Sequence, residues 1–152
     1  MEKKYSIVVI AIITILVIMG LALYMGLFKE ETIKVGETNF VLPSGFSAEG
    51  INEIGDLIIS DHNNNQIFLA EYKNDTVGDY IKHYIHERNL ENQTISSSNF
   101  TIGSTTVYKT TNKNTSSNHY WFVKDGKTYA IYNWNKIENM DNIVFDLIKS
   151  TY

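Results

Sequence analysis

Residues 5–28 form an unbroken run without a charged side chain, YSIVVIAIITILVIMGLALYMGLF. Two lysines precede the run, and Lys29, Glu30 and Glu31 follow it. About 20 apolar residues, each adding roughly 1.5 Å to a helix, span a hydrocarbon core of about 30 Å. The run therefore predicts an N-terminal transmembrane helix whose first partner is the lipid bilayer.

A cleaved signal peptide is an alternative interpretation of the same run, with Gly20-Leu21-Ala22 as a candidate cleavage site. The apolar stretch continues past that site to Phe28, which favours an uncleaved signal anchor. A buried helix of a soluble protein is a third interpretation. The expected single-pass protein of the cell membrane has four parts: a cytoplasmic tail (1–4), the anchor (5–28), a short stalk (29–31) and an extracytoplasmic domain (32–152).

Charge and cysteine content limit what the domain over residues 32–152 can do. The chain has 13 Lys and Arg and 17 Asp and Glu, and three of each precede residue 32, which leaves 10 basic and 14 acidic residues. An acidic domain without a basic cluster does not suit nucleic acid, whose phosphates need neutralising. The chain has no cysteine, which excludes disulfides, thiolate catalysis and Cys-ligated zinc.

The strongest local pattern covers residues 119–134, HYWFVKDGKTYAIYNW. Asp125-Gly126 lies between two β-rich arms and is typical of the two-residue type I′ turn. That turn predicts the register of a hairpin in which Phe122 faces Tyr129 and Trp121 faces Ala130. Because alternate residues of both arms are apolar on both faces, the two strands are expected to be central in a sheet.

The rest of the domain predicts further strands and two helices. Strands are expected over residues 32–35, 40–42, 56–60, 66–72 and 105–111. Apolar residues recur with helical spacing from Val77 to Ile85 and again from Met140 to Ile148. Thr76 followed by Asp79 resembles a capping box at the start of the first helix. The expected fold class is α+β, an antiparallel sheet with two helices packed on one face.

Residues 39–46, NFVLPSGF, resemble the opening strand, proline, glycine and aromatic residue of the PsbP/Mog1-like fold family. In that family a helix, an antiparallel meander and a C-terminal helix follow in the order expected here. The resemblance would cover residues 32–152. It implies a fold only, since the family shares no catalytic residues and none is carried over.

Asp79, His83 and His86 share one face of the first predicted helix, opposite its apolar stripe. Imidazole and carboxylate groups at this spacing are ligands for Zn²⁺ or Cu²⁺. The simpler interpretation is a solvated polar face, so no metal or other cofactor is expected. The order H-x-x-H-E also differs from the H-E-x-x-H of metalloproteases.

Two further features concern the surface of the domain. Trp121, Tyr132 and Trp134 share one face of the hairpin and are candidates for a patch that binds a protein or glycan partner, unless a helix or loop covers them. Asn-x-Ser/Thr sequences make four residues candidates for glycosylation. These residues are Asn74, Asn92, Asn99 and Asn114.

The function expected from these features is a membrane-anchored, non-enzymatic binding or accessory domain that faces outward at the cell surface. One alternative is a structural or assembly subunit of the cell envelope, for which the spacing of Ala22 and Gly26 suits helix–helix contact. A metal-dependent surface enzyme that uses His83 and His86 is the other alternative. The sequence has no pattern that names a ligand.

Overall fold

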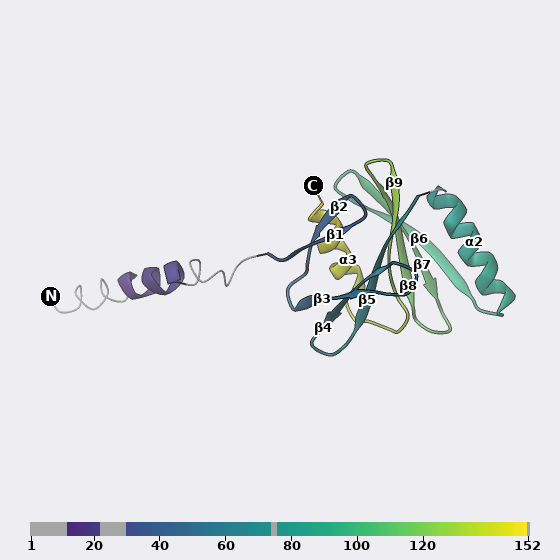
Figure 1. The fold of residues 1–152 in the computed structure, drawn as a ribbon. Coiled ribbons are helices and arrows are strands. Elements are labelled where there is room, and N and C mark those ends of the chain that lie inside the picture. The colour runs from purple at the N-terminus through teal and green to yellow at the C-terminus, as the bar shows by residue number, and fades with distance from the viewer. Residues whose placement is uncertain (1–11, 22–29, 74–75, 152) are drawn as a thin grey trace. The chain divides into compact units, whose positions relative to one another are not determined.

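The structure is a computed structural model that describes residues 12–21, 30–73 and 76–151 (Figure 1). The chain divides into two compact units, residues 1–31 and residues 32–152. In the first unit residues 12–21 are helical, and their apolar side chains are exposed. The second unit contains the strands and the helices α2 and α3.

The prediction of a transmembrane helix over residues 5–28 is corrected by the structure. Among the described residues no helix is both long enough and apolar enough to cross a bilayer. The single-pass localisation that was built on this helix is corrected with it. Residues 1–11 and 22–29, including the small residues Ala22 and Gly26, lie outside the described residues.

The second unit begins with a two-stranded hairpin of β1 (Thr32–Val35) and β2 (Thr38–Val41). The other described strands form one antiparallel sheet in the order β3-β4-β5-β9-β8-β7-β6. Their bounds are β3 (Phe46–Ile51), β4 (Leu57–Asp61), β5 (Gln66–Tyr72), β6 (Ile95–Ile102), β7 (Thr105–Asn112), β8 (Asn118–Lys124) and β9 (Lys127–Asn133).

The predicted register of the β8–β9 hairpin is confirmed. Phe122 pairs with Tyr129 and Trp121 with Ala130, and the two strands lie at the centre of the sheet. Asp125 and Gly126 have φ angles of 50° and 75°, which are the two positive values of a type I′ turn. Turn chemistry within a few residues therefore determines which face each side chain of the hairpin occupies.

The two helices lie on opposite faces of the sheet, so the prediction of both on one face was wrong (Figure 1). Helix α3 (Met140–Lys149) and the β1–β2 hairpin cover the face that carries Tyr120 and Phe122. Helix α2 (Val77–Leu90) covers the face that carries Trp121 and Tyr132. Since β8 and β9 are apolar on both faces, each face needs its own cover to exclude water.

Strands β3 and β6 were not expected from the sequence. Strand β6 has the sequence ISSSNFTI, whose small polar side chains are mostly exposed. Strand β3 carries Glu49 and Gly50 and has a β-bulge between Ala48 and Gly50. Both strands are the edges of the sheet, where burial is too slight to impose an apolar alternation on the sequence.

Helix α2 begins as its cap sequence predicts. The hydroxyl of Thr76 accepts a hydrogen bond from the backbone N–H of Asp79 at 3.3 Å and donates one to the Asp79 carboxylate at 2.7 Å. This reciprocal pair satisfies groups that a helix start leaves without partners. The cap therefore determines the residue at which α2 begins.

Candidate functional site: a groove between α2 and strands β7 and β8

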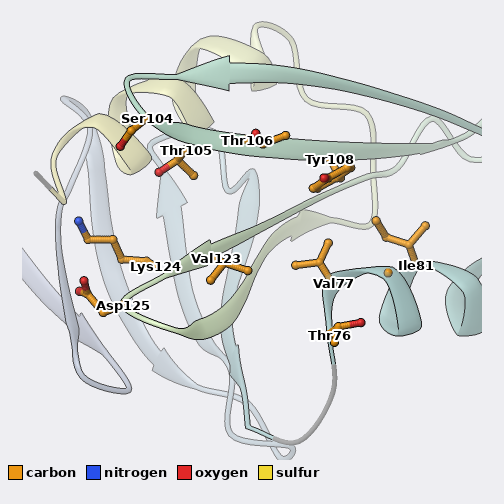
Figure 2. A pocket seen from close by; sticks show the side chains of 11 residues that line it. Thr76, Val77, Ile81, Ser104, Thr105, Thr106, Tyr108, Val123, Lys124 and Asp125 are labelled. Carbon is orange, nitrogen blue, oxygen red and sulfur yellow. The ribbon is translucent and has the colours of Figure 1, made fainter.

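A groove of about 660 Å³ lies where the first two turns of α2 meet the sheet (Figure 2). Its lining residues come from α2, from the β6–β7 turn and β7, and from the end of β8 with its turn. They are Thr76, Val77, Gly78, Ile81, Ser104, Thr105, Thr106, Tyr108, Val123, Lys124 and Asp125. A groove of this volume falls in the range of small-molecule sites.

Apolar side chains from three elements face one another across the groove. Figure 2 shows Val77 and Ile81 of α2 opposite Val123 of β8, with Tyr108 of β7 above them. Val123 and Tyr108 retain 49% and 40% of their exposure, although their neighbour Trp121 on the same sheet face is buried. The groove therefore leaves apolar side chains exposed between the helix and the sheet, whereas elsewhere on this face of the sheet such side chains are buried.

The groove exists because aromatic rings hold α2 over a different part of the sheet. Tyr80 stacks on Trp121, with ring centroids 6.1 Å apart, and contacts Tyr72 at 4.4 Å. Tyr84 packs against His119 at 4.3 Å. These large rings set the height and position of the helix, and α2 does not extend over the end of β8 that carries Val123.

The polar side chains of the lining residues are mostly hydroxyl-bearing. These residues are Thr76, Ser104, Thr105 and Thr106, whereas Lys124 and Asp125 are the charged lining residues. Beside the groove, the hydrogen bond from the Thr76 hydroxyl holds the pKa of Asp79 below its usual value, so this carboxylate is ionised and serves the helix start. The walls thus combine aliphatic and aromatic surface with neutral hydrogen-bonding groups.

Several lining residues carry hydroxyl groups. A hydroxyl nucleophile needs a base within about 3 Å, and that base is usually a histidine that another group orients. None of the residues that line the groove is a histidine.

The candidate metal ligands lie elsewhere, on the solvent side of α2. His83 and His86 are exposed, and the Asp79 carboxylate accepts its hydrogen bond from Thr76. Within the part of the chain that the structure describes, no cluster of three or more His, Cys, Asp or Glu side chains has the arrangement of a metal site.

The three aromatic residues of the predicted partner patch differ in exposure. Trp121 and Tyr132 are each 4% exposed beneath α2. Trp121 donates to the Thr110 hydroxyl, and Tyr132 donates to Asp56 and stacks on Phe68. Burial, followed by the Asp56 interaction, raises the pKa of Tyr132, which stays neutral.

Trp134 is the exposed member of this set, at 49%. Its ring meets the rings of His119 and Tyr132 edge to face, with centroids 5.7 and 5.4 Å away. A small hollow of about 80 Å³ adjoins it, and amide side chains border that hollow. These amides belong to Asn64, Asn65, Gln66 and Asn135. Whether the patch binds a partner stays a prediction.

The glycosylation candidates also have different environments. Asn92 and Asn99 are exposed, Asn92 in the turn after α2 and Asn99 on β6. The side-chain oxygen of Asn114 accepts a hydrogen bond from the Thr94 N–H at 2.8 Å. Asn74 lies outside the described residues.

The groove itself was not predicted, because its residues had ordinary structural roles in the sequence. Val77 and Ile81 belonged to the apolar stripe of a helix, and Tyr108 and Val123 to alternating strands. The one signal in the sequence is that the apolar face of the hairpin that carries Trp121 continues with Val123. Val123 lies beyond the part of the sheet that the aromatic rings of α2 cover. Finding it requires the position of the helix on the sheet.

The composition of the groove is the observation from which the function has to be inferred, because its residues follow no catalytic motif. No protein-family model matches the chain, and no curated protein matches it significantly.

Proposed function

We propose that residues 32–152 form a non-enzymatic binding domain that takes an uncharged, largely apolar ligand in the groove between α2 and strands β7 and β8. The observation that carries this proposal is the exposure of Val123 and Tyr108 opposite Val77 and Ile81. Apolar surface that faces a concave space gains free energy when a ligand displaces water from it, at about 25 cal/mol per Å² buried.

The neutral hydroxyl lining supports an uncharged ligand. Ser104 and Thr106 are exposed and can donate to or accept from polar groups on the ligand, which orients it without requiring a charge. A strongly charged ligand would lose hydration in the groove and meet the single pair of charged residues Lys124 and Asp125 only at one end.

Methyl-detected NMR of the full chain tests this function with two simple uncharged probes, indole and cyclohexanol. We expect the methyl signals of Val77, Ile81 and Val123 to shift together and to saturate at millimolar probe concentration. These probes have about seven to nine non-hydrogen atoms, and probes of this size bind with affinities of this order. Shifts that scatter over the surface, or that never saturate, would contradict a groove site.

A charge at the groove wall provides the matched pair of variants. Val123→Glu places a carboxylate in the apolar wall and should abolish the saturable shifts at Ile81. Ile54→Glu makes the same chemical change at an apolar side chain that is 78% exposed and is not a lining residue. This control should leave probe binding unchanged, and equal losses in both variants would count against the proposal.

A second candidate function is glycan binding at Trp134. Its half-exposed ring is braced edge-on by two neighbouring rings and lies beside four planar amides. Sugar rings stack on exposed aromatic faces while amides bond to their hydroxyls. Titration with cellobiose and maltose should quench Trp134 fluorescence, and Trp134→Ala should remove the effect. No quenching by these sugars would favour the groove alone.

The resemblance to the PsbP/Mog1-like family also stays a proposal. It is supported by element order, since α2 precedes the strands β6–β9 and α3 ends the domain. The family shares no catalytic residues, so this resemblance agrees with a binding domain and adds no ligand.

A further inference from the structure

Strand β6 (Ile95–Ile102) is one edge of the seven-stranded sheet and is bonded to β7 on one side. Its backbone groups alternate in direction. The Thr94 carbonyl accepts from the Lys113 N–H, and Ile102 pairs with Thr105 across a two-residue turn. Even-numbered residues from 94 to 102 therefore point their N–H and C=O groups at β7.

The odd-numbered residues of β6 consequently direct their backbone groups away from the sheet. They are Ile95, Ser97, Asn99 and Thr101. Each offers one donor and one acceptor along a straight edge, and the register with β7 is continuous over all eight residues of β6. No described strand pairs with this side of β6. Such a row of groups is a template for another strand.

The middle of strand β6 is open on both faces of the sheet. Ser97 and Asn99 project on the α2 side, and Ser98 projects on the α3 side. All three side chains are exposed. Neither helix therefore covers the middle of the strand, and a second strand could approach it in the plane of the sheet.

Strand β3, at the opposite edge of the sheet, is protected against pairing with another strand. Strand β3 is interrupted by the β-bulge between Ala48 and Gly50, where Gly50 has a φ angle of 134°. Glu49 places a carboxylate on that strand. Bulges and charges are the devices by which folded proteins prevent edge-to-edge pairing. The sequence of β6 contains no charge, no proline and no bulge.

We propose that β6 pairs antiparallel with β6 of a second copy of this chain, with the two-fold axis at Ser98. This register aligns residues 95–101 of both strands. Ser97 faces Asn99 of the second copy, Ile95 faces Thr101 of the second copy, and Ser98 faces Ser98 of the second copy. The four outward residues of each strand then form four hydrogen-bonded residue pairs between the two copies. Each of these pairs exchanges two backbone hydrogen bonds, which gives about eight in total.

The chemistry of the strand favours a second copy over a charged peptide. Every cross-strand pair in this register is neutral, so no like charges oppose each other although the domain is acidic. A C2 interface needs such self-complementarity. The two sheets would join into one, with both α2 helices on the same face and both grooves open.

A single cysteine tests this register directly, because the chain has no cysteine of its own. At the two-fold axis the Ser98 residues form a non-hydrogen-bonded pair with Cα atoms about 4.5 Å apart, a distance that a disulfide spans. We expect Ser98→Cys in the full chain to form a disulfide dimer under mild oxidation at least tenfold faster than Ser104→Cys. Ser104 is an exposed residue in the turn after β6. Protein concentrations on the order of 0.1–1 mM are suitable, because one pair of strands is a small interface.

Two further variants separate the edge from other kinds of association. Asn99→Pro removes an outward N–H that makes no bond to β7, so Ser98→Cys combined with Asn99→Pro should fall to the rate of the Ser104→Cys control. Asn99→Ser keeps that N–H and should keep the fast rate. Thermal unfolding confirms that each variant is folded.

Equal cross-linking rates for Ser98→Cys and Ser104→Cys would overturn the proposal, since the proposed register brings residue 98, and not residue 104, against the same residue of the second copy. An edge that accepts unrelated extended peptides but not its own copy would also leave Ser98→Cys without a disulfide and would overturn it.

Discussion

The Glu71 side chain lies directly against the backbone at Gly36. The Glu71 side chain is only 5% exposed, and its Oε2 accepts from the Glu37 N–H at 3.1 Å and the Tyr129 hydroxyl at 3.0 Å. These bonds fasten the β1–β2 turn to β5. Gly36 has a φ of 59°, and a Cβ there would lie 1.5 Å from Glu71 Oε2.

We therefore expect Gly36→Ala to be among the more destabilising single changes. The left-handed backbone strain should lower the free energy of unfolding by about 1–2 kcal/mol. Displacing the buried Glu71 carboxylate, which accepts two hydrogen bonds, should lower it by about 1–3 kcal/mol more. Gly45→Ala is the matched control, because Gly45 also has a positive φ, 84°, but open space around its Cβ. Denaturant unfolding should place Gly45→Ala between wild type and Gly36→Ala, and equal midpoints for the two variants would contradict the close approach.

His119 makes the second prediction at this scale. It lies 5% exposed against Tyr132, with ring centroids 4.9 Å apart, and its Nδ1 has no hydrogen-bond partner. Burial, with a smaller contribution from Arg88, lowers the pKa of His119 to about 3. The folded protein therefore keeps His119 neutral, whereas the unfolded chain binds a proton near pH 6.5.

The sign of the pH dependence follows from this difference. Above pH 6.5 neither state is protonated at His119 and stability is complete, whereas between pH 6.5 and 3 the unfolded state alone binds the proton. The free energy of unfolding should fall there by up to about 1.4 kcal/mol per pH unit because of this residue. His119→Phe should remove that slope, measured by urea unfolding at several pH values, while His86→Phe on the exposed face should retain it. An unchanged slope in His119→Phe would show that His119 is protonated in the folded protein.

At the scale of elements, the β8–β9 hairpin determines how the sheet is built. Its type I′ turn sets Tyr120, Phe122, Tyr129 and Ile131 in one buried cluster and Trp121, Ala130 and Tyr132 in the other. A slip by one residue would exchange the two sets between the faces. The tight turn therefore matters for both helices, since each packs on one of these clusters.

Gly126→Val should destabilise the domain by about 1–3 kcal/mol, the cost of a residue held in a strained backbone region. A Cβ at Gly126 meets nothing within 4 Å, so this loss comes from the positive φ angle alone. Gly126→Asn is the matched control, because asparagine tolerates that angle. Thermal unfolding compares the three proteins, and wild-type stability of Gly126→Val would show that the turn is not tight in solution.

At the scale of the whole molecule, both hydrophobic clusters of the described residues consist of side chains from residues 33–148. Each cluster therefore lies within the second unit, and the chain has no cysteine that could form a disulfide. We expect residues 32–152 to fold alone, with the circular dichroism of an α+β protein and a melting temperature within a few degrees of the full chain. A disordered fragment, or one that folds only after Zn²⁺ is added, would contradict this expectation.

Features with partners only a few residues apart could be predicted from the sequence. The Asp125-Gly126 turn determined the hairpin register, and Thr76 with Asp79 determined the start of α2. Hydropathy predicted a membrane span over residues 5–28, whereas among the described residues no helix is both long and apolar enough to be one. The polar edge strand β6 gave no apolar alternation to detect.

The tertiary structure decided the features that depend on distant segments. The sequence alone determined that residues 119–134 form a central hairpin with two apolar faces, since the turn geometry acts locally. Only packing decided that α2 and α3 cover opposite faces and that Trp121 is buried while Val123 stays open. The physical reason is that α2 is too short to cover the whole apolar face of the sheet. Tyr80 and Tyr84 determine the position of α2 on the sheet, and that position determines which apolar side chains are covered and which line the groove.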